Sequence, residues 1–157
     1  MGDPVLRERA APVEVVTDEI RRLIDDMFDT MYAEEGVGLA APHVGIVQSV
    51  IVFDPHEEDI EPFALVNPSI TFFSEELEKG EEGCLSIPGL KEIVERSVTV
   101  RAEGLDVRGQ PVTIEAGGLL ARILQHEVDH VDGILFIDRV SALKRKLLLN
   151  KWQKVKP

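Results

Sequence analysis

The sequence predicts an α+β fold in which antiparallel sheets pack around a central helix that bears an H-E-x-x-H motif. Helical patterns near residues 18–34 and 118–131 flank a series of short β-branched and aromatic runs separated by turn residues. At 157 residues the chain has the length of one ordinary domain. We therefore expect a single catalytic domain over residues 1–157, with 142–157 as a basic C-terminal helix or tail.

Composition excludes several classes of protein. Hydrophobic residues make up 44% of the sequence and charged residues 29%, which excludes wholesale disorder. The net charge of −12 argues against nucleic-acid binding, sequence-specific or broad, because phosphate contacts need a basic surface. No apolar run is long enough to cross a membrane. The lone cysteine, Cys84, excludes an internal disulfide, so we expect a cytoplasmic protein, or an organelle-internal one if a transit peptide was removed.

The first helix is predicted at about residues 18–34, after an extended lead-in over residues 4–16. Thr17 is its predicted N-cap, and Asp18 and Glu19 favour the first turn. The apolar residues that follow recur at helical spacing and predict one buried stripe, made of Ile20, Leu23, Ile24, Met27, Phe28 and Met31.

Small residues dominate the next segment, residues 36–45, and exclude a regular helix there. They let a ligand or another backbone approach closely. A phosphate-binding loop is a competing interpretation, but no Gly-Lys-Ser/Thr sequence follows and no clear strand precedes it.

Short β-branched and aromatic runs predict strands at 49–54, 63–67, 70–73, 98–107 and 112–116. The last two flank a turn at 108–111 and predict a hairpin. The acidic segments 56–59 and 75–82 are predicted to be solvated loops.

The segment 118–131 carries the motif. Its apolar residues cover more than one helical face, which predicts a central, buried helix. His126 and His130 would lie one turn apart, with Glu127 beside them. This pattern suits a metal held by two histidines that activates a water molecule, with Glu127 as general base. A chance match that binds no metal is the alternative.

Cys84 is a candidate third ligand. A lone intracellular cysteine is more often a small buried hydrophobe. Here it follows a glycine in a chain that also offers two histidines at metal spacing. Cys84, His126 and His130 would form a site with an open fourth position, which is typical of catalytic zinc-type centres.

Three segments together resemble the peptide deformylase family. That family carries a G-x-G-L-A-A-P-Q-x-G-like loop, an E-G-C-L-S loop and a Q-H-E-x-D-H helix. This sequence has the corresponding segments in the same order, at 36–45, 82–86 and 125–130. The predicted helix at 18–34 and the hairpin also lie where the family has them, so the resemblance covers nearly the whole chain.

The resemblance implies an enzyme that removes the formyl group from the N-terminal formylmethionine of nascent polypeptides and releases formate. It implies that Cys84, His126 and His130 bind one divalent metal and that Glu127 is the general acid/base. Fe²⁺ is implied as the native metal, although the ligand types alone would suggest zinc. Zn²⁺, Ni²⁺ or Co²⁺ are expected as replacements in purified protein.

The resemblance also implies how the substrate is held. The donors to the oxyanion would be the backbone N–H of Leu85 and the side chain after Pro42, which is His43. The peptide would lie as an added strand against the small-residue loop. The methionine pocket is expected to be framed by Gly36, Val37, Gly38, Leu120 and Ile123. Asp129 is a candidate acceptor for a ligand histidine, or an ordinary helix carboxylate.

Two positions depart from the family pattern. His43 stands where the family carries glutamine, whose amide donates at any working pH, whereas a neutral histidine donates from only one nitrogen. The sequence therefore predicts an oxyanion site that is weaker or more dependent on pH. A role for His43 as an extra metal ligand is less favoured, because three ligands are already supplied. Lys91 replaces a frequent arginine, so any bidentate contact made there would be lost.

Two other functions remain open at this point. H-E-x-x-H alone permits a metalloprotease or another amide hydrolase, although Cys84 in E-G-C-L-S does not suit one. A reduced-activity or non-enzymatic paralogue that binds peptides or ribosomes is the other, and the presence of Glu127 argues against it.

The segment 142–157 has six basic residues and no acidic one. It is either a solvated last helix whose cations favour the helix dipole or a patch that docks on an acidic partner such as the ribosome.

Overall fold

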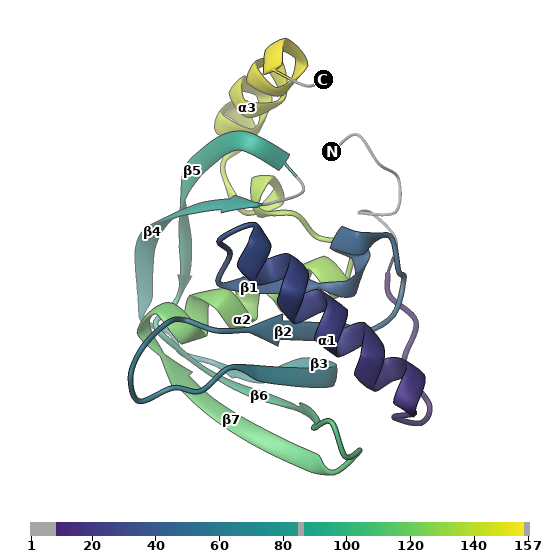
Figure 1. Cartoon of the computed structure of the whole chain (residues 1–157). Coiled ribbons are helices and arrows are strands. Elements are labelled where there is room, and N and C mark those ends of the chain that lie inside the picture. Colours follow the sequence, from purple (N-terminus) through teal and green to yellow (C-terminus); the bar gives the residue numbers. More distant parts are fainter. Residues whose placement is uncertain (1–8, 85–86, 156–157) are drawn as a thin grey trace.

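The central helix α2 (Gly118–Val131) lies between a five-stranded sheet and a separate two-stranded sheet (Figure 1). This computed structural model describes residues 9–84 and 87–155, without the side chains of 84, 87–90, 136–137 and 152–155. The larger sheet is antiparallel, in the order β1-β2-β3-β6-β7, with β1 (Gly38–Ala40), β2 (Val50–Phe53), β3 (Phe63–Phe73), β6 (Thr99–Leu105) and β7 (Pro111–Gly117). The smaller sheet pairs β4 (Leu77–Cys84) with β5 (Ile87–Ser97). The predicted α+β class is confirmed.

Helix α1 (Asp18–Ala33) packs on the opposite face of the larger sheet from α2. It begins at Thr17, whose hydroxyl accepts the backbone N–H of Ile20 at 3.3 Å, as an N-cap should. Its buried residues are Ile20, Ile24, Met27 and Met31. They pack against Leu39, Val50, Val52, Ala64 and Val66 of the sheet. The predicted helix and its apolar stripe are therefore both confirmed.

Strand β2 is buried on both faces and joins two cores. Because side chains alternate along a strand, Val50 and Val52 face α1, whereas Ile51 and Phe53 face α2. Among the described strands, the short strand β1 pairs only with β2 and forms one edge of the sheet. This strand also packs against α2.

Strand β3 replaces two predicted strands, 63–67 and 70–73. The Asn67-Pro68 step does not end the strand, because register shifts on either side of Ser69 absorb it as bulges against β6. Asn67 has a φ of 52°, which an asparagine tolerates better than most residues. The prediction of two separate strands, divided at Pro68, is therefore wrong.

The prediction of a solvated loop at 75–82 is also wrong, because most of this segment forms β4. Among its described side chains only that of Glu82 is buried, so residues 77–83 show almost no apolar pattern. Backbone pairing with β5 from Leu77 to Cys84 holds it instead. A strand stabilised mainly by its partner leaves little signal in its own composition.

The other predicted elements agree with the structure. Strands β6 and β7 form the predicted hairpin, and Gly117 ends β7 directly before α2. Residues 56–59 form a loop. The segment 36–45 contains no regular α-helix; it forms β1 and the 3-10 turn η2 (Ala41–Val44).

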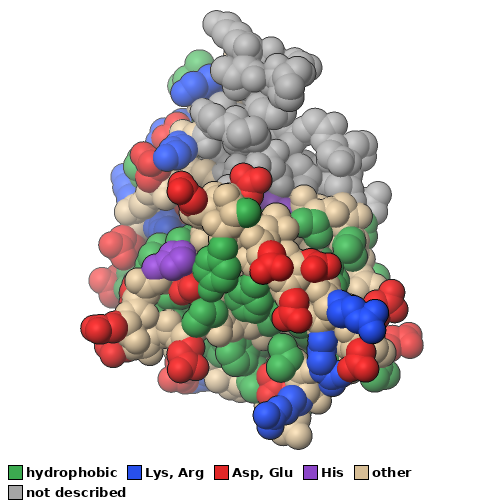
Figure 2. Space-filling model, viewed as in Figure 1, with side chains coloured by type: hydrophobic (Ala, Val, Ile, Leu, Met, Phe, Trp, Pro, Cys, Tyr) green, Lys and Arg blue, Asp and Glu red, His purple; other side chains and the backbone are tan. Residues whose placement is uncertain are grey.

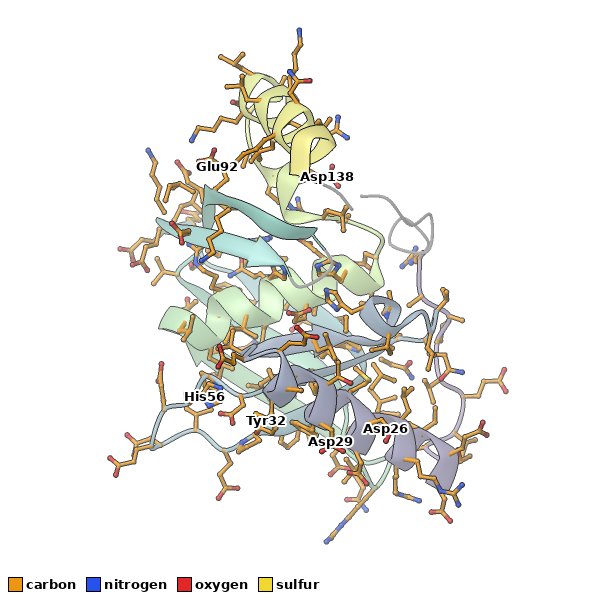
Figure 3. The ribbon with its side chains drawn as sticks, turned by 45° about the horizontal axis from the view of Figure 1, so that its top comes forward. Asp26, Asp29, Tyr32, His56, Glu92 and Asp138 are labelled. Carbon is orange, nitrogen blue, oxygen red and sulfur yellow. The ribbon has the colours of Figure 1, made fainter. Side chains whose placement is uncertain are left out.

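The C-terminal helix α3 (Ala142–Val155) projects from the rest of the chain (Figure 1). Figure 3 shows Glu92 and Asp138 at its base. Lys144 pairs with Glu92 at 3.6 Å and Arg145 with Asp138 at 3.5 Å. Leu148 of α3 is buried. These contacts hold α3 against β5 and the 3-10 turn η3 (Phe136–Arg139).

Acidic side chains are spread over the face that carries α1, in keeping with the net charge of −12 (Figure 2). Within residues 9–155, as far as the structure describes them, no helix has the length and apolar character that crossing a membrane requires.

The lead-in segment, predicted at 4–16, is described from residue 9 and is fixed to the sheet by Asn67. The Asn67 Oδ1 accepts the N–H of Val13 at 2.7 Å, and its Nδ2 donates to the Val13 carbonyl at 2.8 Å. Val13 is buried, so both groups depend on this side chain.

We predict that Asn67→Ala lowers the free energy of unfolding by about 3 kcal/mol, because it orphans two buried groups and strains the left-handed backbone. Asn67→Gly is the matched control, since it removes the same hydrogen bonds but accepts the positive φ, and it should cost about 1 kcal/mol less. Urea denaturation measures both. A loss below 1 kcal/mol for the alanine variant would contradict the assignment.

Candidate metal centre

The imidazoles of His126 and His130 converge on one point at the C-terminal end of α2. Their Nε2 atoms lie 3.2 Å apart, and both residues are buried. Two nitrogen ligands at about 2.0–2.1 Å from a tetrahedral ion are about 3.3 Å apart. The pair therefore fits a single metal ion without rearrangement.

The other ring nitrogen of His126 meets a carboxylate. Its Nδ1 lies 2.8 Å from Oε1 of Glu82, which is 44 residues away in the sequence. A proton on Nδ1 is donated to this carboxylate and leaves Nε2 with its lone pair directed at His130. A carboxylate behind a histidine is the usual outer partner of a metal ligand, because it fixes the ring and raises its basicity.

Glu82 is itself held by two arginines. Arg96 donates from Nε and Nη2, both at 2.8 Å, and Arg122 donates from Nη1 at 2.6 Å. Burial by itself would raise the pKa of Glu82, but the hydrogen bonds from Arg96 and His126 outweigh it and lower that pKa to about 2. Glu82 therefore stays ionised, and the orientation of His126 stays fixed, throughout the neutral range.

Glu127 lies beside the two histidines and against strand β1. It is 5% exposed, and no hydrogen-bond donor among the described residues reaches its Oε1. A Cβ on Gly38 would come within 2.8 Å of Glu127 Oε2, so any larger residue at position 38 would force this carboxylate to shift. A buried carboxylate with an oxygen free to accept is suited to exchange protons with a reactant.

His43 closes the site from the turn η2. Its ring centroid lies 4.1 Å from that of His130, and its Nδ1 is 3.9 Å from Glu127 Oε1. The N–H of Ala40 donates to Nδ1 at 2.8 Å, and the Ala40 carbonyl is 3.0 Å from the same atom. When Nδ1 accepts from Ala40, the proton of the neutral ring is on Nε2, which becomes a donor. Ligand-type atoms of His43, Glu127 and His130 all lie within 4.8 Å of one another, so a role as a ligand is also geometrically possible.

The predicted pocket residues belong to two neighbouring segments: Gly36, Val37 and Gly38 lead into and begin β1, and Leu120 and Ile123 are part of α2. A Cβ on Gly38 would also come within 2.9 Å of Ile123 Cγ2, so the loop and α2 are in close contact here. Leu120 and Ile123 are buried, whereas Val37 is 36% exposed and directly precedes β1. An extended peptide can add to such an unpaired edge.

The predictions for Cys84 and Leu85 concern atoms outside the described residues, namely the Cys84 side chain and the whole of Leu85. The backbone of Cys84 ends strand β4. Glu82, two positions earlier, reaches His126, so this strand runs past the two histidines. The Nζ of Lys91 lies 3.8 Å from Oε1 of Glu81, and both of these side chains are exposed.

Sequence reasoning missed the residues behind the histidines. Glu82 takes the position that was suggested for Asp129, whose carboxylate instead accepts from Arg96 and Arg139. The signal for Glu82 was present, because it directly precedes Gly83-Cys84 in the E-G-C-L-S segment. Arg96 and Arg139 had no such signal, since nothing in their local sequence indicates a distant partner.

Known proteins match this sequence over nearly its whole length. A family model described as polypeptide deformylase matches residues 1–146. A peptide deformylase of Azotobacter vinelandii is 50% identical over 97% of this chain and 90% of its own length. One from Alkalilimnicola ehrlichii is 52% identical over 98% of this chain and 86% of its own length.

Solved structures agree with these matches. A peptide deformylase from Legionella pneumophila superimposes with a TM-score of 0.91 at 44% identity, covering 99% of this chain and 92% of its own. One from Synechococcus elongatus gives 0.89 at 45% identity, covering 99% and 89%. This chain therefore belongs to the polypeptide deformylase family, whose members are metal-dependent hydrolases that remove the N-formyl group from newly made polypeptides.

Proposed function

We propose that Cys84, His126 and His130 hold the metal of this deformylase and that Glu127 moves the proton in the reaction. The observation that carries this proposal is the 3.2 Å separation of the two Nε2 atoms in front of the carboxylate of Glu82. The role of Cys84 rests on its motif and on the course of strand β4. A metal held by one sulfur and two nitrogens would keep a fourth position open for reactants.

When bound, the metal supplies Lewis acidity that makes a water molecule a nucleophile at neutral pH. Glu127 accepts the proton of that water and returns it to the amine as the C–N bond breaks, so the products are formate and a free N-terminus. The backbone N–H of Leu85 and the Nε2–H of His43 donate to the oxygen on which negative charge develops. The buried position of Glu127 keeps bulk water from competing for its proton.

We propose Fe²⁺ as the native metal, with Zn²⁺, Ni²⁺ or Co²⁺ as replacements. A thiolate ligand adds negative charge and makes the bound ion a weaker Lewis acid. Imidazole and thiolate ligands bind all four of these ions. The metal that occupies the site therefore depends on which ion is available. Anaerobic purification followed by metal analysis tests this assignment, with formate release per metal ion as the second measurement.

The substrate lies as an extended strand along the free edge of β1, with its methionine against Gly36, Val37, Gly38, Leu120 and Ile123. Support comes from the unpaired edge of the sheet and from the close contact between Gly38 and Ile123. Because nascent polypeptides are the substrates of this family, we infer that the chain works in the cytoplasm, or inside an organelle that makes its own proteins.

We expect rapid formate release from a formyl-Met peptide and no cleavage of its acetylated or internal-amide analogues. Cleavage of an internal amide at a similar rate would instead support a metalloprotease-type hydrolase.

We predict that Glu127→Gln lowers kcat by about a thousandfold while metal content and KM stay near their original values, because general acid–base catalysis supplies about 10²–10⁴ in rate. Glu115→Gln is the matched control, since that carboxylate is 71% exposed on the β6–β7 hairpin. A kcat within tenfold of the original enzyme would remove Glu127 from the mechanism.

We predict that His43→Gln raises kcat by about tenfold, because a complete oxyanion donor contributes about a hundredfold or more and histidine supplies only part of it. The pH–rate profile should flatten at the same time, since an amide does not titrate in the working range. No gain at any pH would refute the prediction. A loss of bound metal would show that His43 is a ligand.

For α3 we propose docking on the ribosome through its cations. Two of them, Lys144 and Arg145, pair with acidic residues of the chain itself, whereas Lys146 and Lys151 form no ion pair with any residue that the structure describes. Deleting 142–157 should weaken co-sedimentation with ribosomes at low salt.

The double variant Lys146→Glu/Lys151→Glu should do the same without removing the buried Leu148. Arg22→Glu/Arg108→Glu changes the net charge equally but far from α3 and should bind normally. Unchanged binding of both α3 variants excludes this docking mode.

A further inference from the structure

The turn η3, which follows α2 in the sequence, packs against β4 and β5 and brings the side chain of Arg139 against Asp129 of α2. Arg139 donates from Nε to Oδ2 at 3.0 Å and from Nη2 to Oδ1 at 2.7 Å. We name this two-point pair the Arg139 clamp. The hydrogen bonds to Asp129 also raise the pKa of Arg139 above its ordinary value.

The clamp continues toward the candidate metal centre through three buried groups. Asp129 Oδ2 accepts from Nη1 of Arg96 at 2.6 Å. The remaining edge of Arg96 is held by both oxygens of Glu82, and Glu82 accepts from His126. An unbroken series of charge-assisted hydrogen bonds thus joins η3 to a candidate ligand.

Because the guanidinium of Arg96 is planar, a movement of Asp129 is transmitted to Glu82. Its Nε and Nη2 face Glu82, whereas Nη1 faces Asp129, and all three lie in one rigid plane. A shift of Asp129 therefore tilts the guanidinium and moves both oxygens of Glu82. Because the His126 ring is oriented by one of those oxygens, the tilt reaches the nitrogen that would bind the metal.

Solvent can compete with the clamp but not with the rest of the series. The side chains of Arg96 and Glu82 are 5% exposed, whereas that of Arg139 is 43% exposed. Arg139, Asp129 and Arg96 line a cavity of about 500 Å³ behind α2. Without Arg139, water in this cavity would hydrate Asp129 and loosen its hold on Arg96, so we expect a partial loss of positioning and not a collapse of the fold.

We propose that Arg139 is a positioning residue for His126, acting through Asp129, Arg96 and Glu82, and that it slows release of the metal. This inference rests on the proposed role of His126 as a ligand. Arg139 touches neither the reacting atoms nor the two histidines in any described contact, so its effect must pass through the series.

The test uses the full-length chain loaded with Co²⁺ and measures the rate of transfer to an excess of chelator. Arg139→Gln should release Co²⁺ about tenfold faster, the lower end of what outer partners of metal ligands contribute. Its Co²⁺ absorption spectrum should also change, because the ligand field follows the His126 ring. Arg139→Lys keeps the charge but not the fork, and should lie between Arg139→Gln and the original protein.

Arg101→Gln is the matched control. Arg101 also donates from Nε and Nη2 to one carboxylate, that of Glu115, but on the exposed hairpin. The Arg101→Gln variant should release Co²⁺ at the same rate as the original protein.

Release from Arg139→Gln within twofold of the original rate would overturn the proposal, as would equal acceleration in Arg101→Gln. A lower melting temperature of the metal-free variant with unchanged Co²⁺ release would also overturn it, since that is the signature of a purely structural pair. If Arg139→Gln does not fold, the rate for Arg139→Lys decides by the same twofold criterion. If His126→Ala retains Co²⁺ as tightly as the original protein, the proposed function itself is wrong.

Discussion

The hydrogen bond between Glu82 and His126 is the constraint on which the rest of the site depends. It joins the two-stranded sheet to α2 at the point where the two candidate ligands converge. Burying a carboxylate here is costly unless it is fully paired. Arg96 and Arg122 supply that pairing, and both come from elements that the same contact brings together. Docking of the small sheet and orientation of the histidine are therefore one event.

Apolar packing and polar contacts hold different parts of the fold together. Two apolar cores, on either face of β2, hold α1, the larger sheet and α2 together. The side chains of the β4–β5 hairpin that the structure describes add little to these cores, and their contacts with α2 are largely polar. Arg122 donates to the carbonyls of Val94 and Glu78, and Gln125 exchanges two hydrogen bonds with the backbone of Ser97. Polar contacts are directional, so they set the angle of the hairpin in a way that apolar packing alone would not.

Local patterns in the sequence were enough to predict α1, the β6–β7 hairpin, α2 and the one-turn spacing of its histidines, because each depends on residues within a few positions of one another. They failed for β4, whose acidic, exposed side chains conceal backbone pairing with β5. They also failed for Arg96 and Arg139, because contacts 14, 33 and 10 residues apart leave no periodic trace. The candidate ligands were thus recognisable from the sequence, whereas the groups that orient them required the fold.

The same geometry explains why little motion is needed for a metal to bind. With its Nδ1 proton committed to Glu82, His126 can use Nε2 only as an acceptor. At 3.2 Å that nitrogen can take a hydrogen bond from His130, and nearly the same separation suits two ligands of one ion. Exchange of a proton for the ion therefore leaves both rings almost in place. The entropy lost in orienting the ligands is therefore lost during folding, when β4, β5 and α2 assemble, and not when the metal binds.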